Sequence, residues 1–225
     1  MMDGQIALSR GNALLDAAGL DELPGETVCL RVGQMLHVTG DLVWFPTTSV
    51  IRSEVGAAKV LGGWIDASGA VGVVEALQGA DPEILWTVEV TGLAFVVERI
   101  FVSALLERSP RFSQAVMAWL SQMASDTRKR AAYNVHVHAE DAVSRLICDL
   151  HRAHGYPKEF NMKQSEIARL TGIQRTTVCA VMVKLKQKNI IRHTRNRITV
   201  LQTERPLVTE VAASKSGNIA MQMAH

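Results

Sequence analysis

Cationic side chains in the last third of the sequence are the group best placed to do chemistry, because together they can bind a polyanion. Residues 139–205 hold 13 Lys and Arg against 6 Asp and Glu, whereas residues 1–138 hold 10 against 15. A compact basic unit joined to an acidic one is the pattern expected when the basic unit binds nucleic acid. Chance asymmetry of a solvated surface would give the same counts, so charge alone leaves both interpretations open.

Side-chain sets typical of enzymes and metal sites are missing from the sequence. It has no evident Ser/His/Asp set, catalytic carboxylate pair, HExxH motif or phosphate-binding loop. Cys29, Cys148 and Cys179 are too few and too widely spaced for a disulfide framework, a Cys-rich zinc site or a four-Cys iron–sulfur cluster. His136 and His138 could ligate a metal or haem, but such a pair is more often plain surface. We therefore expect no enzyme, no cofactor and no metal.

A helix-turn-helix is predicted inside the basic region. Gly172 stands where the turn requires a positive φ, and Ala168 is small where the second helix must cross close to the first. Each feature alone is a weak signal, but together with matched apolar spacing they make a strong one. The apolar positions that would lock the two helices together are Ile167, Leu170, Ile173, Val178, Met182 and Leu185.

Further elements are expected on either side of this motif. A helix over 139–154 precedes it and stops at Gly155-Tyr156-Pro157. A basic hairpin over 189–201, with a polar turn at 194–197, follows it as a wing. The buried face of the preceding helix is predicted to be Ala142, Val143, Leu146, Ile147 and Leu150.

Residues 24–100 are predicted to form β structure. Ten of the 16 glycines fall between Gly25 and Gly92 and separate short β-branched runs. Such runs at intervals of about ten residues favour a sandwich or barrel. A short helix over roughly residues 5–19 comes before them. The runs are 27–32, 42–45, 49–55, 71–74, 85–90 and 93–97.

A long helix over 110–133 is predicted between the β region and the basic region. Pro110 is tolerated in its first turn, and Ser109 can cap it. An apolar stripe along such a helix can form a dimer interface, although the stripe could instead pack on its own β domain. The predicted dimer interface is Phe112, Val116, Trp119, Leu120, Met123 and Thr127.

The sequence over residues 140–202 resembles the winged helix-turn-helix of the CRP/FNR transcription regulators, chiefly in Gln164–Leu185 and Asn196–Leu201. More loosely, Trp44–Ile51 and Gly69–Leu77 are similar to β-roll segments of a cyclic-nucleotide-binding-like branch, and 131–146 to its hinge. The resemblance implies an α+β fold. Its expected parts are a jelly-roll-like β-roll sensor domain (1–105), a dimerisation helix and hinge (106–138), a winged helix-turn-helix (139–205) and a tail (206–225).

The resemblance also implies how DNA would be read. The second helix of the motif enters the major groove, where Arg175 can bond guanine O6 and N7 and short methyl-bearing side chains suit thymine. Family members use an Arg-Glu-Thr-Val-x-Arg pattern, whereas this sequence has Thr176 and Ala180 at the Glu and second Arg positions. The expected base-edge residues are Gln174, Arg175, Thr176, Thr177 and Ala180. The expected phosphate contacts are Lys163, Gln164, Thr177, Lys184, Arg195 and Arg197, and we expect at least one of Lys184, Lys186 and Lys188 to be merely solvated.

The sequence departs from family members that sense small ligands. Those that bind cyclic AMP carry an Arg-Ser pair, but residues 79–86 lack arginine and place Asp81 and Glu83 where an anionic phosphate needs positive charge. Glu75 could remain a ribose contact, although we interpret it as a turn residue. The oxygen-sensing branch needs clustered N-terminal cysteines, and only Cys29 lies there. We therefore expect no control by cyclic AMP or by an iron–sulfur cluster.

The expected function is a homodimeric, sequence-specific DNA-binding transcription regulator acting on an inverted-repeat operator, with RNA polymerase as a further candidate partner. The alternative is a regulator-like protein that works through protein contacts and has a ligand-free sensor domain. No run of about 18 apolar residues suggests a membrane span, and the first 20 residues lack a signal-peptide layout. A cytoplasmic location is therefore expected.

Overall fold

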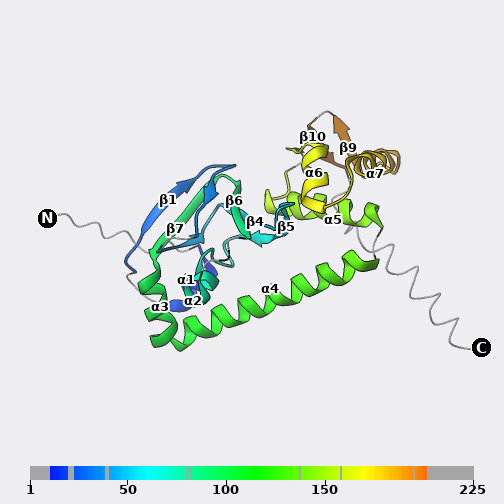
Figure 1. Cartoon of the computed structure of the whole chain (residues 1–225). Coiled ribbons are helices and arrows are strands. Elements are labelled where there is room, and N and C mark those ends of the chain that lie inside the picture. Colours follow the sequence, from blue (N-terminus) through cyan, green and yellow to red (C-terminus); the bar gives the residue numbers. More distant parts are fainter. Residues whose placement is uncertain are drawn as a thin grey trace, which may run out of the picture. The chain divides into compact units, whose positions relative to one another are not determined.

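The computed structural model describes residues 11–19, 23–38, 41–79, 81, 83–136, 138–157, 159–194 and 196–201. The chain divides into two compact units, residues 1–132 and 133–225 (Figure 1). This division falls near the end of the long helix α4 (Pro110–His136), inside the segment predicted to be helix and hinge. Each unit is described by itself.

The first unit is a β-roll of two antiparallel sheets. One sheet has the order β1-β7-β3 and the other β2-β6-β4-β5. The two sheets confirm the predicted β architecture and the α+β fold class. The strands are β1 (Glu26–Leu30), β2 (Met35–Leu36), β3 (Leu42–Pro46), β4 (Val50–Val55), β5 (Val60–Ile65), β6 (Ile84–Val90) and β7 (Gly92–Glu98).

Several local expectations for this unit were wrong or incomplete. The apolar run 71–74 is not a strand, because Val71 makes only an isolated bridge to Trp44 and the helix α2 (Val73–Gln78) begins two residues later. β5 was missed, since Gly62 and Gly63 interrupt its β-branched pattern. The helix α3 (Arg99–Arg108) was missed as well. α1 (Ala13–Ala18) matches the end of the expected N-terminal helix, whose residues 5–10 lie outside the described residues.

Two apolar clusters hold the first unit together. One lies between the sheets and contains Trp44, Ile51, Trp86 and Val88 among its buried members. The other joins strands β3 and β7 to helices α1, α2, α3 and α4, through Phe45, Phe95 and others. α4 therefore belongs to the packing of this unit. Its start is capped as expected, with the Ser109 Oγ accepting a bond from the backbone N of Phe112 at 3.3 Å.

The inner face of α4 corrects part of the predicted dimer interface. Phe112 is 0% and Val116 2% exposed, both within the core of their own unit. They have no surface to offer a second chain, so the alternative of packing on the β domain holds for them. Trp119, Leu120 and Met123 are half-buried against the same unit and Thr127 is exposed.

Beyond the end of α4, the described residues of the second unit form three helices and a small antiparallel sheet. The buried face of the first helix, α5, includes Val143, Leu146, Ile147 and Leu150, as expected, whereas Ala142 is half-buried. The short strand β8 was not anticipated, and it pairs with β10 in the order β8-β10-β9. The elements are α5 (Ala139–Ala153), β8 (Glu159–Asn161), α6 (Gln164–Thr171), α7 (Arg175–Gln187), β9 (Ile191–Thr194) and β10 (Arg197–Val200).

Candidate nucleic-acid interface

The turn between α6 and α7 has the geometry that the sequence indicated. Gly172 ends α6 in the left-handed region at φ 70°, and its N–H bonds the carbonyl of Arg169 at 3.3 Å. A side chain would strain this conformation, which explains the glycine. The buried side of the pair includes Ile167, Leu170, Val178, Met182 and Leu185, and Ile173 is half-buried.

The start of α7 is open to solvent. Gln174 occupies the N-cap position, yet its side chain makes no capping hydrogen bond, so its amide is not used up within the helix. Four further predicted contacts, Arg175, Thr176, Thr177 and Ala180, are exposed as well. The unpaired N–H groups of a helix start add a partial positive charge there. The structure thus brings all the predicted base-edge residues onto one accessible stretch of helix.

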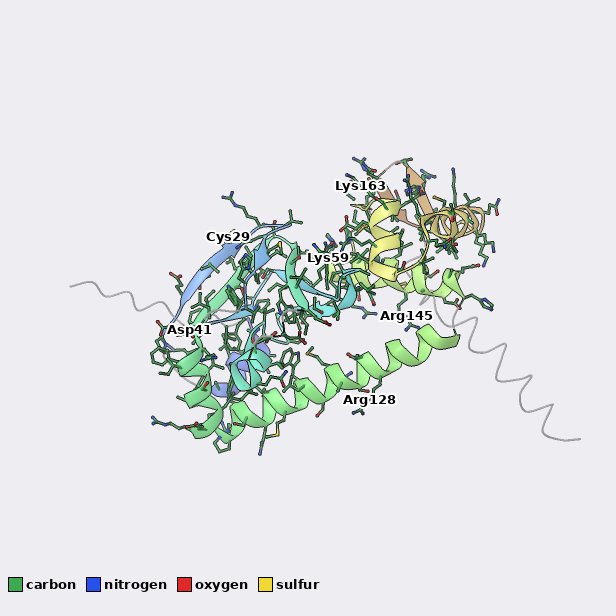
Figure 2. All side chains as sticks on the ribbon, in the orientation of Figure 1. Cys29, Asp41, Lys59, Arg128, Arg145 and Lys163 are labelled. Atoms are coloured by element: carbon green, nitrogen blue, oxygen red, sulfur yellow. The ribbon has the colours of Figure 1, made fainter. Side chains whose placement is uncertain are left out.

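Lys163 and Lys184 are also exposed, Lys163 at the N-cap of α6 (Figure 2). Lys188 is not merely solvated, because its Nζ pairs with the Glu140 carboxylate at the start of α5. This ion pair connects the end of α7 to α5 within the unit.

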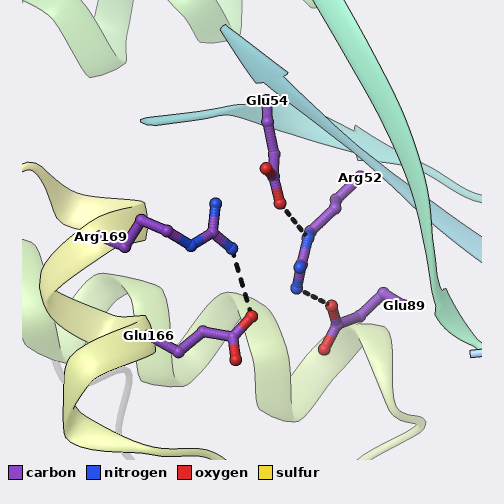
Figure 3. A network of polar contacts seen from close by, with 5 residues as sticks. All are labelled: Arg52, Glu54, Glu89, Glu166 and Arg169. Atoms are coloured by element: carbon purple, nitrogen blue, oxygen red, sulfur yellow. Dashed lines mark hydrogen bonds and ion pairs between the residues drawn. The ribbon is translucent and has the colours of Figure 1, made fainter. Parts of the chain in front are cut away.

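A second ion pair lies within α6, where Arg169 Nη2 is 3.2 Å from Glu166 Oε1 (Figure 3).

Gln164 differs from the other predicted phosphate contacts because it is half-buried. Its Oε1 accepts a hydrogen bond from the Cys179 Sγ at 2.9 Å, which links the start of α6 to the middle of α7. No sequence pattern predicts this pair, since the two residues are 15 positions apart on different helices. With the oxygen turned to the thiol, the Gln164 amide nitrogen keeps its N–H groups for another acceptor.

The wing carries an exposed charge at the start of its central strand, β10. The Arg197 side chain is 61% exposed and its Nη1 lies 3.4 Å from Glu159 Oε2 on the adjacent strand β8. An exposed ion pair of this kind is weak, so a phosphate can replace the carboxylate as partner. Arg195, the other predicted wing contact, lies outside the described residues.

A histidine on β9, an edge strand of the wing sheet, has a lowered pKa. Burial, and secondly the charge of Lys186, lowers the pKa of His193 below its usual 6.5. Its Nε2 is buried without a hydrogen-bond partner. A proton on this ring would therefore have no acceptor, which agrees in direction with the lowered pKa.

The first unit contains the residues that the sequence comparison set against a cyclic-nucleotide site, and one of them, Glu75, already has a hydrogen-bond partner within the unit. Glu75 is buried in α2 and not in a turn as interpreted from the sequence, and its Oε1 accepts a bond from Trp86 Nε1 at 3.2 Å. Asp81 and Glu83 are exposed acids beyond that helix. Between the sheets, Trp44 and Trp86 fill the interior, against which Trp119 packs.

Arg52, on strand β4 of the β2-β6-β4-β5 sheet, also has its guanidinium already paired with carboxylates. Arg52 Nε lies 2.8 Å from Glu54 Oε1, and its Nη1 pairs with the Glu89 carboxylate (Figure 3). The register of β4 against β6 shifts between Val50 and Ile51, so that Glu89 is directly opposite neither of these two residues. All three side chains are nearly buried, so this arginine serves two carboxylates of its own unit.

Among the described residues, no helix has the length and apolarity needed to cross a membrane. Within the same residues, no group of three or more His, Cys, Asp or Glu is arranged to hold a metal. His138 is exposed, and the side chain of His136 lies outside the description.

Comparison with known proteins agrees with this geometry. Residues 142–205 match the family model described as the Crp-like helix-turn-helix domain. No curated protein sequence matches the chain.

Solved structures extend the likeness to the rest of the fold. The c-di-GMP responsive global regulator CLP of Xanthomonas campestris is 16% identical, with a TM-score of 0.66 over 84% of this chain and 99% of that one. A CRP/FNR-family transcriptional regulator of Thermus thermophilus is 14% identical, with a TM-score of 0.64 over 79% and 94%. FixK2 of Bradyrhizobium japonicum is 12% identical, with a TM-score of 0.64 over 82% and 96%.

Fold and site agree with one class of protein, since residues 142–205 match the Crp-like helix-turn-helix domain. The chain as a whole has the fold of solved structures that include a transcriptional regulator described as CRP/FNR family. The resemblance recognised in the sequence is thereby confirmed.

Proposed function

We propose that this protein is a sequence-specific regulator that binds an inverted-repeat operator as a homodimer and is not controlled by cyclic AMP. The observation that carries the proposal is the exposed start of α7. Arg175, Thr176 and Thr177 face solvent while Val178 and Met182 bury the opposite side of the helix. In this motif the start of the second helix contacts base edges.

The outer face of α4 supports a homodimer. Opposite the buried Phe112 and Val116, the helix presents Gln114, Met117 and Ser121, all exposed, and Met117 is 63% exposed. Two copies related by a two-fold axis would present two α7 helices to successive major grooves on one side of the duplex, about 34–36 Å apart. We therefore move the proposed contact from the buried residues of the stripe to this face.

Independence from cyclic AMP is supported by the polar groups of the β-roll. Glu75 already accepts a bond from Trp86, and Arg52 already pairs with two carboxylates. A cyclic phosphate would meet Asp81 and Glu83 without a guanidinium to neutralise it.

One experiment tests these parts together. The full-length protein is mixed with random duplexes of about 40 base pairs, bound DNA is recovered and sequenced, and the mass of the complex is measured by sedimentation with and without cyclic AMP. We expect an inverted repeat with half-site centres about 10–10.5 base pairs apart or a multiple of that, two chains per duplex, and an affinity unchanged by the nucleotide.

Contrary results separate the parts of the proposal. Recovery of no preferred sequence would overturn DNA reading and favour the alternative of a regulator working through protein contacts. One chain per duplex would overturn the homodimer, and tighter binding with cyclic AMP would overturn nucleotide independence. RNA polymerase is the partner that such a regulator would contact at a promoter.

A further inference from the structure

The exposed face of α7 has an uncharged centre that carries methyl groups. Val178, Val181, Met182 and Leu185 are buried and define the inner face of the helix. Directly opposite, at helical spacings of four and three residues, lie Thr176, Ala180 and Val183, and all three are exposed.

Val183 has no evident role in folding. Its side chain is 54% exposed, so it contributes little buried area. A β-branched residue also lowers helix propensity relative to alanine. A single exposed apolar residue is ordinary on a protein surface, but this one continues the line of predicted base-edge residues. It is eight residues from Arg175, about 12 Å along the helix, which is close to the width of the major groove.

The positive charge of α7 lies on the two sides of this neutral centre. Arg175 and Lys186 occupy one flank and Lys184 the other, and all three are exposed. In a major groove, the phosphates line both rims and the base edges form the floor. A helix with cationic flanks and a methyl-bearing centre matches that arrangement of charge.

We propose that Val183 is a specificity-determining residue that contacts the C5-methyl group of a thymine, extending a surface formed with Thr176 and Ala180. Among the groups that base pairs present in the major groove, this methyl is the apolar one. The inference rests on the proposed DNA-binding function and adds a residue that the sequence had not singled out.

The test deletes the methyl group from each partner in turn. The probe is the preferred duplex recovered by selection, in which each thymine is replaced singly by deoxyuridine, so that only the methyl is lost. Val183→Ala and the wild-type protein are titrated on the whole set. Alanine raises helix propensity at this exposed site, so the variant should fold. Val32→Ala is the matched control, because Val32 is 66% exposed and lies in the first unit.

We expect Val183→Ala to bind the thymine duplex about three- to tenfold more weakly, from the loss of two methyl groups in contact. At one thymine of each half-site, replacement by deoxyuridine should weaken DNA binding by the wild-type protein but leave binding by Val183→Ala unchanged. The effects of the two changes are then non-additive, as expected when the two groups are in contact. Val32→Ala should match the wild type throughout.

Three outcomes would overturn the inference. Val183→Ala could bind every duplex as tightly as the wild type, could lose the same factor on thymine and deoxyuridine duplexes alike, or could lose no more than Val32→Ala. Each leaves the proposed function standing, because a preferred duplex has been recovered. Failure to recover any preferred duplex is the separate result that removes the proposed function and the inference with it.

Discussion

In the first unit the charged residues of the β2-β6-β4-β5 sheet are nearly buried and pair with one another, whereas in the second unit those of α7 stand in solvent. Arg52 serves Glu54 and Glu89, while Arg175 and Lys184 are exposed. Ion pairs between these side chains connect neighbouring strands of the sheet, and they leave few charged groups available to bind a ligand. Exposed charges on a rigid helix are available to a large polyanion, because they need not break an ion pair within the protein in order to bind it.

Removing the central arginine should break this contrast most strongly. Arg52→Met removes the ion pairs that Arg52 makes with the carboxylates of Glu54 and Glu89, whose side chains are 5% and 8% exposed. Breaking a buried pair typically costs about 3–5 kcal/mol. All four tryptophans, Trp44, Trp64, Trp86 and Trp119, lie in the first unit, so denaturation followed by tryptophan fluorescence reports on that unit alone.

Arg99→Met is the control for this loss. The Arg99 side chain is 48% exposed, and its Nε lies 3.9 Å from Oδ1 of the exposed Asp41. Such pairs contribute about 1 kcal/mol or less. Equal losses in the two variants would show that the Arg52 pairs are no more stabilising than a surface contact.

Base reading should depend on Arg175 more than on any other side chain of α7. Arg175→Ala should cost about 1–3 kcal/mol on the preferred duplex and much less on random DNA, because a bidentate guanine contact is lost. Arg197→Ala should weaken both duplexes by similar factors and reduce the salt slope by about one unit, because one phosphate contact is lost. Titrations across a salt series measure both, and the same uniform loss in the two variants would leave Arg175 only a phosphate anchor.

The two units also differ in how far the sequence predicted them. The second unit is set by local spacing: Gly172 and the apolar positions of α6 and α7 are neighbours in the chain, so the helix-turn-helix could be predicted. The first unit depends on contacts between distant strands. The short run 71–74 could be helix or strand on pattern alone, and Gly62 and Gly63 hid β5.

A similar limit applied to the candidate site residues. The stripe on α4 showed which face is buried but not against what, so Phe112 and Val116 were assigned to a dimer instead of to their own core. The contact of Cys179 with Gln164 is a tertiary one that no periodicity shows. The exposure of Val183 became visible only when the buried face of α7 was known.

A smaller effect is expected where the two helices of the motif are joined by a side-chain bond. Cys179→Ala removes the thiol that donates a hydrogen bond to Gln164 Oε1. Because the Gln164 side chain then loses its fixed orientation, we expect the variant protein to bind DNA about two- to tenfold more weakly. A neutral amide releases no counterion, so the salt slope should stay constant, unlike that of Arg197→Ala. Cys179→Ser should restore binding, and a further loss from Cys179→Ala in a Gln164→Ala background would exclude this route.

The smallest effect concerns the pH dependence of the second unit. The pKa of His193 is lowered below 6.5 in the folded chain by burial and then by Lys186. As the pH falls, the unfolded chain takes up this proton first, so stability declines from about pH 6.5 downward and is fully retained above it. His193→Gln keeps a polar side chain that does not titrate and should reduce the loss of stability between pH 7.5 and 5, which melting followed by circular dichroism can measure. His138→Gln removes an exposed histidine of the same unit and should leave the pH dependence as in the wild type. If both variants flatten the curve equally, the neutral state of the wing histidine has no special part in it.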